Sequence, residues 1–105
     1  MARCWNCGTT RNLERHHVFY GNANRRLSDQ DGMVVMLCAK CHRGDKGVHH
    51  NSVLDIQLKQ EAQRVWMAHT GRDEKSFRRR YGRNYLDENE LADLKQKIWS
   101  GSIWR

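Results

Sequence analysis

The sequence predicts a small α+β protein, with two short strands in the N-terminal half and helices in the C-terminal half. Two Cys-x-x-Cys pairs enclose the strand-like segments, and the C-terminal half repeats apolar residues at intervals of three and four. The chain has 105 residues, enough for one domain, and only 38% are hydrophobic, so we expect a small core stabilised by a structural metal. We expect a zinc-framed finger over residues 1–50 and a helical extension of the same domain over residues 51–105.

The N-terminal half alternates between apolar segments and polar segments bounded by glycine. Residues 1–12 contain a Cys-x-x-Cys-Gly sequence, typical of a metal-binding knuckle in which Gly8 relieves a tight turn. Residues 13–20 carry Val, Phe and Tyr and predict a strand. Residues 21–32 are polar and glycine-bounded, which predicts a loop. Residues 33–37 are apolar and predict a second strand, buried on both faces.

A short helical turn is expected near Cys41, interrupted by Gly44 and Gly47. Ser52 is a suitable N-cap for a longer helix, and Gly71 is positioned to end it. Its apolar face would carry residues at three- and four-residue spacing, namely Leu54, Leu58, Ala62, Val65, Trp66 and His69.

Two further helices are expected after Gly71. Asp73 is placed to cap the first, which Gly82 would end, and Asp87 is placed to cap the second, which Gly101 would end. The second would present one apolar face, formed by Leu91, Leu94, Ile98 and Trp99.

The cysteines Cys4, Cys7, Cys38 and Cys41 form two Cys-x-x-Cys pairs, each able to present two thiolates to one tetrahedral zinc ion. Three alternatives exist. Two disulfides would need an oxidising compartment, a redox pair would not need a second pair, and Cys38 to His42 also matches the c-type haem attachment pattern, which normally calls for export. The N-terminus has no apolar run typical of a secretory signal or a membrane span. We therefore expect a cytoplasmic protein with structural zinc.

Four histidines that could do metal or proton chemistry lie within or beside the cysteine frame, namely His16, His17, His42 and His49. Neighbouring side chains on a regular strand point to opposite faces, so His16 and His17 can serve one site only at a strand end or bulge. The alternative is that one histidine is a hydrogen-bonded core residue and the others lie on the surface.

These motifs together resemble the zinc-framed HNH endonucleases. The resemblance covers Cys4 to about His49, and it includes the acid-x-His-His-aliphatic sequence of residues 14–18 between the cysteine pairs. Two later segments, Gly-Val-His at residues 47–49 and Tyr-Gly-Arg-Asn-Tyr-Leu at residues 81–86, resemble small phage-type members of the family.

The resemblance implies a ββα-metal finger that hydrolyses DNA phosphodiester bonds. His17 would be the general base, and His16, His42 and His49 would bind a divalent cation such as Mn, Ni, Co, Zn or Mg. A neutral imidazole can accept a proton from water near pH 7, and a cation can offset charge on the phosphate and the departing 3′ oxygen. The expected products carry a 5′-phosphate and a 3′-hydroxyl.

One residue departs from the family pattern. The family's middle Asn would fall at Met33, five residues before Cys38, and a Met side chain cannot make the hydrogen bonds by which that Asn braces the loop carrying the base. We expect a nearby polar group such as Asp31, or a backbone contact, to replace it; otherwise cleavage would be weak.

The net charge of +7 favours a polyanionic partner, although it could also serve solubility alone. We expect sequence-neutral phosphate contacts from arginines in two segments, namely Arg25 and Arg26, and Arg78, Arg79, Arg80 and Arg83. The apolar tail around Trp99 and Trp104 could pack on the core, bind a protein partner or mediate self-association.

The sequence therefore supports two functions of different classes. The first is a metal-dependent DNA endonuclease, cutting one or both strands with little sequence demand. The second is a zinc module that binds nucleic acid or protein without catalysis. A His-His pair between the cysteine pairs favours the first, because a binding module has no evident need for it. The resemblance also implies a phage setting, and hence a host cytoplasm.

Overall fold

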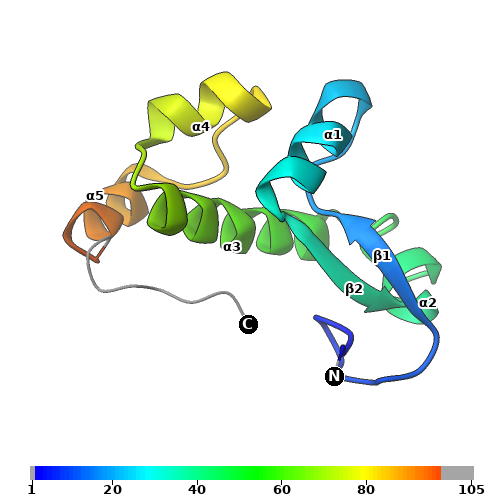
Figure 1. Cartoon of the computed structure of the whole chain (residues 1–105). Coiled ribbons are helices and arrows are strands. Elements are labelled where there is room, and N and C mark those ends of the chain that lie inside the picture. The colour runs from blue at the N-terminus through cyan, green and yellow to red at the C-terminus, as the bar shows by residue number, and fades with distance from the viewer. Residues whose placement is uncertain (1, 98–105) are drawn as a thin grey trace. The chain divides into compact units, whose positions relative to one another are not determined.

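The computed structural model describes residues 2–97, with the side chains of residues 94–97 left undescribed. Within this part of the chain there are one two-stranded antiparallel sheet and five helices, which confirms the predicted α+β class (Figure 1). The chain divides into two compact units, Met1–Leu58 and Lys59–Arg105. The first unit contains both Cys-x-x-Cys pairs and the four candidate histidines. Among the described residues, no helix is long and apolar enough to cross a membrane.

The sheet pairs β1 (Leu13–His17) with β2 (Val34–Cys38), and Leu13 lies opposite Cys38. The first strand is shorter than predicted, because the chain leaves the sheet after His17. Val18 and Phe19 then continue as buried residues outside the strand. The expectation that β2 is buried on both faces is wrong, because Val34 and Met36 are only half-buried.

The predicted loop over residues 21–32 is wrong, since a helix, α1 (Asn22–Asp31), occupies it. The flanking glycines act as helix boundaries: Gly21 precedes the first turn, and Gly32 has the left-handed conformation (φ +71°) common at helix C-termini. Ser28 is the only buried residue of this helix, so no apolar periodicity marks it in the sequence. Ala, Arg, Leu and Gln, all good helix formers, supply much of its composition instead.

A single helical turn, α2 (Ala39–Arg43), follows β2 directly and places Cys41 and His42 beside the sheet. The predicted interruption by glycine is confirmed. A Cβ atom on Gly44 would clash with the carbonyl oxygen of Lys40, and one on Gly47 with the carbonyl of Cys41. The chain therefore turns back tightly over α2, and the backbone N–H of Val48 donates to the carbonyl of Cys41.

The long helix α3 (Ser52–Thr70) has the predicted extent, but its cap differs from the prediction. Asn51 caps it, because its Oδ1 accepts a hydrogen bond of 3.2 Å from the backbone N–H of Leu54, whereas Ser52 is the first helical residue. The predicted apolar face is buried except at His69, which is exposed.

Two predicted caps are confirmed in the second unit. Asp73 accepts from the N–H of Ser76 before α4 (Glu74–Tyr81), and Asp87 accepts from the N–H of Glu90 before α5 (Glu88–Lys97). Gly82 ends α4 in the left-handed conformation. The rings of Trp66 and Phe77 meet edge to face, with centroids 5.4 Å apart, and form part of this unit's core. The predicted residues Ile98, Trp99, Gly101 and Trp104 lie outside the described part of the chain.

Candidate metal sites and catalytic cleft

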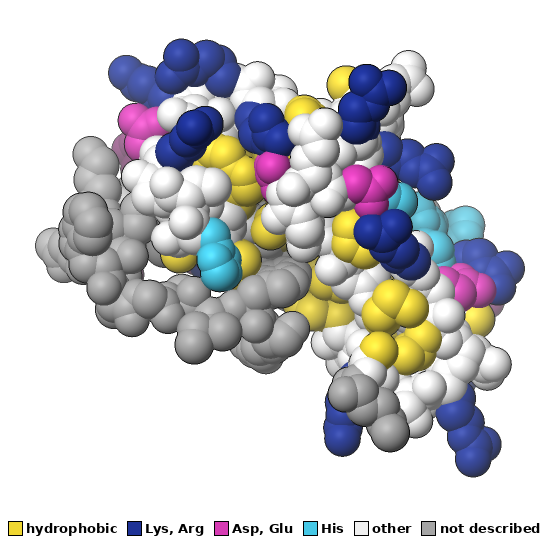
Figure 2. Space-filling view, viewed as in Figure 1, with side chains coloured by type: hydrophobic (Ala, Val, Ile, Leu, Met, Phe, Trp, Pro, Cys, Tyr) yellow, Lys and Arg dark blue, Asp and Glu magenta, His cyan; other side chains and the backbone are white. Residues whose placement is uncertain are grey.

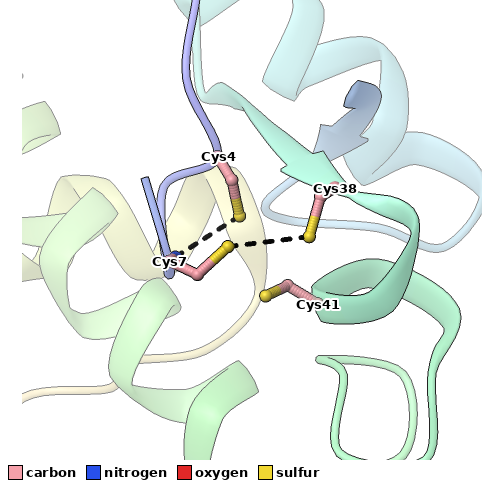
Figure 3. A group of neighbouring side chains, drawn as sticks. All are labelled: Cys4, Cys7, Cys38 and Cys41. Atoms are coloured by element: carbon pink, nitrogen blue, oxygen red, sulfur yellow. Dashed lines mark hydrogen bonds between the residues drawn. The ribbon is translucent and has the colours of Figure 1, made fainter. Parts of the chain in front are cut away.

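The four cysteines predicted to bind zinc lie together in the first unit. Cys4 and Cys7 come from the knuckle before β1, Cys38 from the end of β2, and Cys41 from α2, with their sulfurs turned toward one another (Figure 3). All four Sγ atoms lie within 4.8 Å of one another, close enough to hold one metal ion. The Sγ atoms of Cys7 and Cys38 are 3.8 Å apart. With Zn–S bonds of about 2.3 Å, a tetrahedron has edges of about 3.8 Å, so the cluster has the size that zinc requires.

The polar groups around this cluster favour thiolates at some positions. Burial raises the pKa of Cys4, but hydrogen bonds from the backbone N–H groups of Cys7, Cys38 and Asn6 outweigh it and lower that pKa to about 6. The pKa of Cys41 rises to about 12, because of burial and the three neighbouring cysteines, although the Asn6 amide donates to its sulfur. A cation bound here would have to displace the proton of Cys41, so binding should release protons.

Two backbone hydrogen bonds join the N-terminal arm, residues 2–12, to β2 and α2. The N–H of Trp5 donates to the carbonyl of Met36, and the N–H of Ala39 donates to the carbonyl of Asn12. The cysteine cluster joins the arm to β2 and α2 at the same place, because Cys4 and Cys7 belong to the arm, Cys38 to β2 and Cys41 to α2.

A second cluster of ligand atoms is formed by His16, His42 and His49. Their ring nitrogens all lie within 4.8 Å of one another, and the Nε2 atoms of His42 and His49 are 3.0 Å apart. Two imidazole nitrogens bound to one metal at about 2.1 Å lie about 3.0–3.4 Å apart, depending on coordination number. The donor set and its spacing therefore fit a divalent cation of the kind that binds imidazole.

The carboxylate of Glu14, for which the sequence predicted no role of its own, orients His42. Oε1 of Glu14, on β1, lies 2.8 Å from Nδ1 of His42, which leaves Nε2 directed toward His49. Arg43 contacts the same carboxylate with Nε and Nη2. The hydrogen bonds from Arg43 and then His42 lower the pKa of Glu14 from 4.5 to about 2. A carboxylate behind a histidine in this way fixes its tautomer and raises its basicity as a ligand.

His17 follows His16 but faces a different neighbour. Its Nε2 lies 3.0 Å from Oδ1 of Asp29 on α1. This is an ion-pair distance, but the two groups are not aligned as a hydrogen bond. The imidazole of His17 at this distance, together with Arg15, lowers the pKa of Asp29. Because His17 is the last residue of β1, strand alternation does not separate it from His16, and both line the same cleft.

The cleft has a volume of about 520 Å³ and is lined by histidines, two arginines and a tyrosine. Arg15 and Arg25 are on its wall, while Arg26 is not among its lining residues. Tyr20 also lines it, and its hydroxyl donates to Asp55 at 3.1 Å, so its ring is held in place. Figure 2 shows a group of His side chains at the right edge of the molecule, next to Lys and Arg side chains. The cleft thus combines cationic side chains with potential metal ligands.

The predicted basic segment lies in the second unit, and Figure 2 shows Lys and Arg side chains gathered over α4. Arg78 and Arg79 are exposed, and Arg78 approaches Glu74 at 3.5 Å. Arg80 and Arg83 lie over the rings of Tyr81 and Tyr85, at 6.0 and 5.1 Å from the ring centroids. These four arginines belong to one small unit, whereas Arg25 and Arg26 belong to the other.

Three residues of the first unit were missed as site residues by the sequence analysis, namely Glu14, Ser28 and Asp29. Glu14 had been noted only as part of a motif, and an acid two residues before a candidate ligand could have indicated its role. No sequence signal indicated Ser28 or Asp29, because their helix had been taken for a loop. Asp31, the residue suggested as a substitute for the middle Asn, is not among the residues lining the cleft.

Comparison with protein families, curated proteins and solved structures found no match to this chain. The geometry of the cysteine cluster, the histidine cluster and the cleft is therefore the basis for a functional proposal.

Proposed function

We propose that the protein is a metal-dependent endonuclease that hydrolyses phosphodiester bonds in DNA. One observation carries the proposal: three histidine ligand atoms lie within 4.8 Å of one another, in a cleft that His17 also lines. A metal beside a potential base is the minimum needed to hydrolyse a phosphodiester bond. The motifs that resemble the HNH endonucleases assign the same residues to the same roles.

In this mechanism His17 accepts a proton from a water molecule in the cleft. The water oxygen then bonds to phosphorus, and the bond from phosphorus to the 3′ oxygen breaks with its electron pair remaining on that oxygen. A divalent cation on His16, His42 and His49 would stabilise the negative charge on the phosphate and the leaving oxygen. A proton from solvent water then neutralises the leaving oxygen, and the products carry a 5′-phosphate and a 3′-hydroxyl.

The arginines supply affinity in the proposed function. Arg25 and Arg15 line the cleft and would contact a phosphate near the reacting bond. The exposed arginines of α4 would contact the DNA backbone without reading its sequence. Zinc on the four cysteines would be structural, because a Cys4 site leaves no open coordination position for substrate.

A second candidate function is a zinc module that binds nucleic acid without cutting it. It is favoured by Met33, which stands where the resembling family carries its middle Asn. It gives no reason, however, for Glu14 to orient His42 toward His49.

The two functions are separated by incubating supercoiled plasmid with the purified protein and Mg, Mn, Co, Ni or Zn ions in turn. The endonuclease predicts nicked or linear products that require added metal and are lost in the His17→Ala variant. The matched control is His50→Ala, an exposed histidine outside both clusters, which should cut normally. Binding without cutting under every metal would support the zinc module instead.

A further inference from the structure

The helix α1, which the sequence did not predict, ends against the segment that follows His17. Ser28 lies in its last turns and is fully buried. Its hydroxyl donates to the carbonyl of Phe19 at 2.7 Å and accepts from the N–H of Phe19 at 3.2 Å. One side chain thus satisfies both backbone groups of a buried residue just outside the strand, where no sheet partner is available.

A backbone bridge reinforces this attachment. The N–H of Met33 donates to the carbonyl of Ser28 at 2.8 Å, and the N–H of Val18 donates to the carbonyl of Met33 at 3.0 Å. Met33 therefore acts through its backbone, and its apolar side chain is buried. The residues immediately after His17 are held by hydrogen bonds to the C-terminal end of α1 and the residues that follow it.

The next residue of the same helix contacts the imidazole itself. Asp29 Oδ1 lies 3.0 Å from Nε2 of His17 and 2.8 Å from Nη2 of Arg15. A carboxylate at Nε2 favours the tautomer that carries its proton there, which leaves Nδ1 as the nitrogen able to accept a proton. Ser28 and Asp29 are neighbours, so any shift in the end of α1 would move the backbone and the ring of His17 together.

We propose that the C-terminal end of α1 positions the general base, with Ser28 holding the backbone after His17 and Asp29 holding its imidazole so that Nδ1 accepts the proton. Ser28 and Asp29 are positioning residues, since both act through His17. The inference rests on the proposed endonuclease function, and it explains how this chain can brace the base with a methionine at position 33. A base displaced by about 1 Å can cost about 100-fold in rate.

The tautomer can be tested without any cleavage. Long-range proton–nitrogen NMR spectra of the zinc-loaded protein, with histidines labelled with nitrogen-15 and no second metal added, report which ring nitrogen of His17 carries the proton. We expect the Nε2–H tautomer in the wild type and a mixture of tautomers in Asp29→Asn. A wild-type His17 protonated on Nδ1 alone would overturn the role of Asp29.

Cleavage kinetics test the positioning itself. Ser28→Ala and Asp29→Asn should each lower kcat about 10- to 100-fold with KM for DNA nearly unchanged, and Ser28→Thr should recover part of the loss because it keeps the hydroxyl. Gln30→Ala, an exposed position on the same helix, is the matched control and should keep the wild-type rate. Leu54→Ala, a buried residue of α3, controls for loss of stability alone, since it should lower Tm without lowering kcat at a temperature where it is folded.

The outcomes separate this inference from the proposed function. If the wild type cuts DNA and both variants keep its kcat, the positioning role is wrong and the endonuclease stands. If Leu54→Ala lowers kcat as much as Ser28→Ala does, the effect of Ser28 is general stability and its positioning role is wrong. If the wild type cuts no DNA under any metal, the proposed function itself fails, while the tautomer of His17 still tests its contact with Asp29.

Discussion

If the cysteine cluster binds zinc as expected, removing that zinc should unfold the N-terminal arm and strongly destabilise the first unit. The perturbation is either Cys41→Ser, which removes one sulfur ligand, or a strong chelator added to the wild type. Cys41 is suited to the test because it lies in α2, on the opposite side of the cluster from the knuckle. The substitution keeps a small polar side chain in place, so the loss can be assigned to the metal.

The expected magnitude follows from comparing the hydrogen bonds that attach the arm with the entropy of ordering it. Two backbone hydrogen bonds, through Trp5 and Ala39, attach residues 2–12 to β2 and α2. Together they contribute about 1–3 kcal/mol, whereas ordering the backbone of such an arm costs on the order of 10–20 kcal/mol. Zinc binding to a site of this kind supplies about 10–16 kcal/mol, which is of the size needed to offset that cost.

The assay combines metal analysis with thermal unfolding. The wild type should contain one zinc per chain, and loss of even about 4 kcal/mol should lower Tm by roughly 15–30 °C in a protein of this size. His50→Ala is the matched control and should keep both its zinc and its Tm. Zinc-free wild-type protein, or Cys41→Ser with an unchanged Tm, would refute the reasoning.

Three further predictions concern charge and polarity. The pKa of Glu14 falls from 4.5 to about 2 on folding, so its ion pairs stabilise the protein fully above pH 4.5. This stabilisation is lost as the pH falls through about 2. An NMR titration of the Glu14 carboxyl should show the low pKa, and Arg43→Ala should raise that pKa. The triple variant Arg78→Ala, Arg79→Ala and Arg80→Ala should bind DNA more weakly, and by the same factor for every sequence. The slope of log K against log salt concentration, measured by fluorescence anisotropy, should fall in magnitude by up to about 3. Arg3→Ala is the control and should leave this slope nearly unchanged. Met33→Asn should lower the free energy of unfolding, measured in denaturant titrations, by about 1–3 kcal/mol, because the position is buried. It should not raise the cleavage rate, because Ser28 already braces the backbone after His17. Faster cleavage by this variant would contradict that role of Ser28.

Much of the fold could be predicted because local chemistry determines it. The Cys-x-x-Cys pairs, the caps at Asp73 and Asp87, and the glycines that end α3 and α4 each act within a few residues of their position in the sequence. The helix α1 could not be predicted by the same means. It buries Ser28 alone, so it lacks an apolar face, and its Asn, Ser and Asp residues are also typical of loops.

The two ligand clusters were predictable as residues but not as an arrangement. The histidines were identified from their types and spacing, whereas the distances among His16, His42 and His49 depend on the tight return of the chain at Gly44 and Gly47. The contacts that orient them join residues far apart in sequence. Glu14 reaches His42 across the sheet, and Asp29 reaches His17 from α1, and no local pattern encodes either contact.

The most direct test of the endonuclease measures the cleavage rate across a series of metal concentrations for two histidine variants. His17→Ala should lose about 100- to 10,000-fold in rate, equivalent to roughly 3–5 kcal/mol of barrier, and added metal should not restore it, because the lost group is the base. His42→Ala should also be slow, but its rate should rise with metal concentration, because the lost group is a ligand. Rescue of His17→Ala by metal, with no rescue of His42→Ala, would contradict the assignment of base and ligand, and wild-type rates in both variants would contradict the endonuclease site itself.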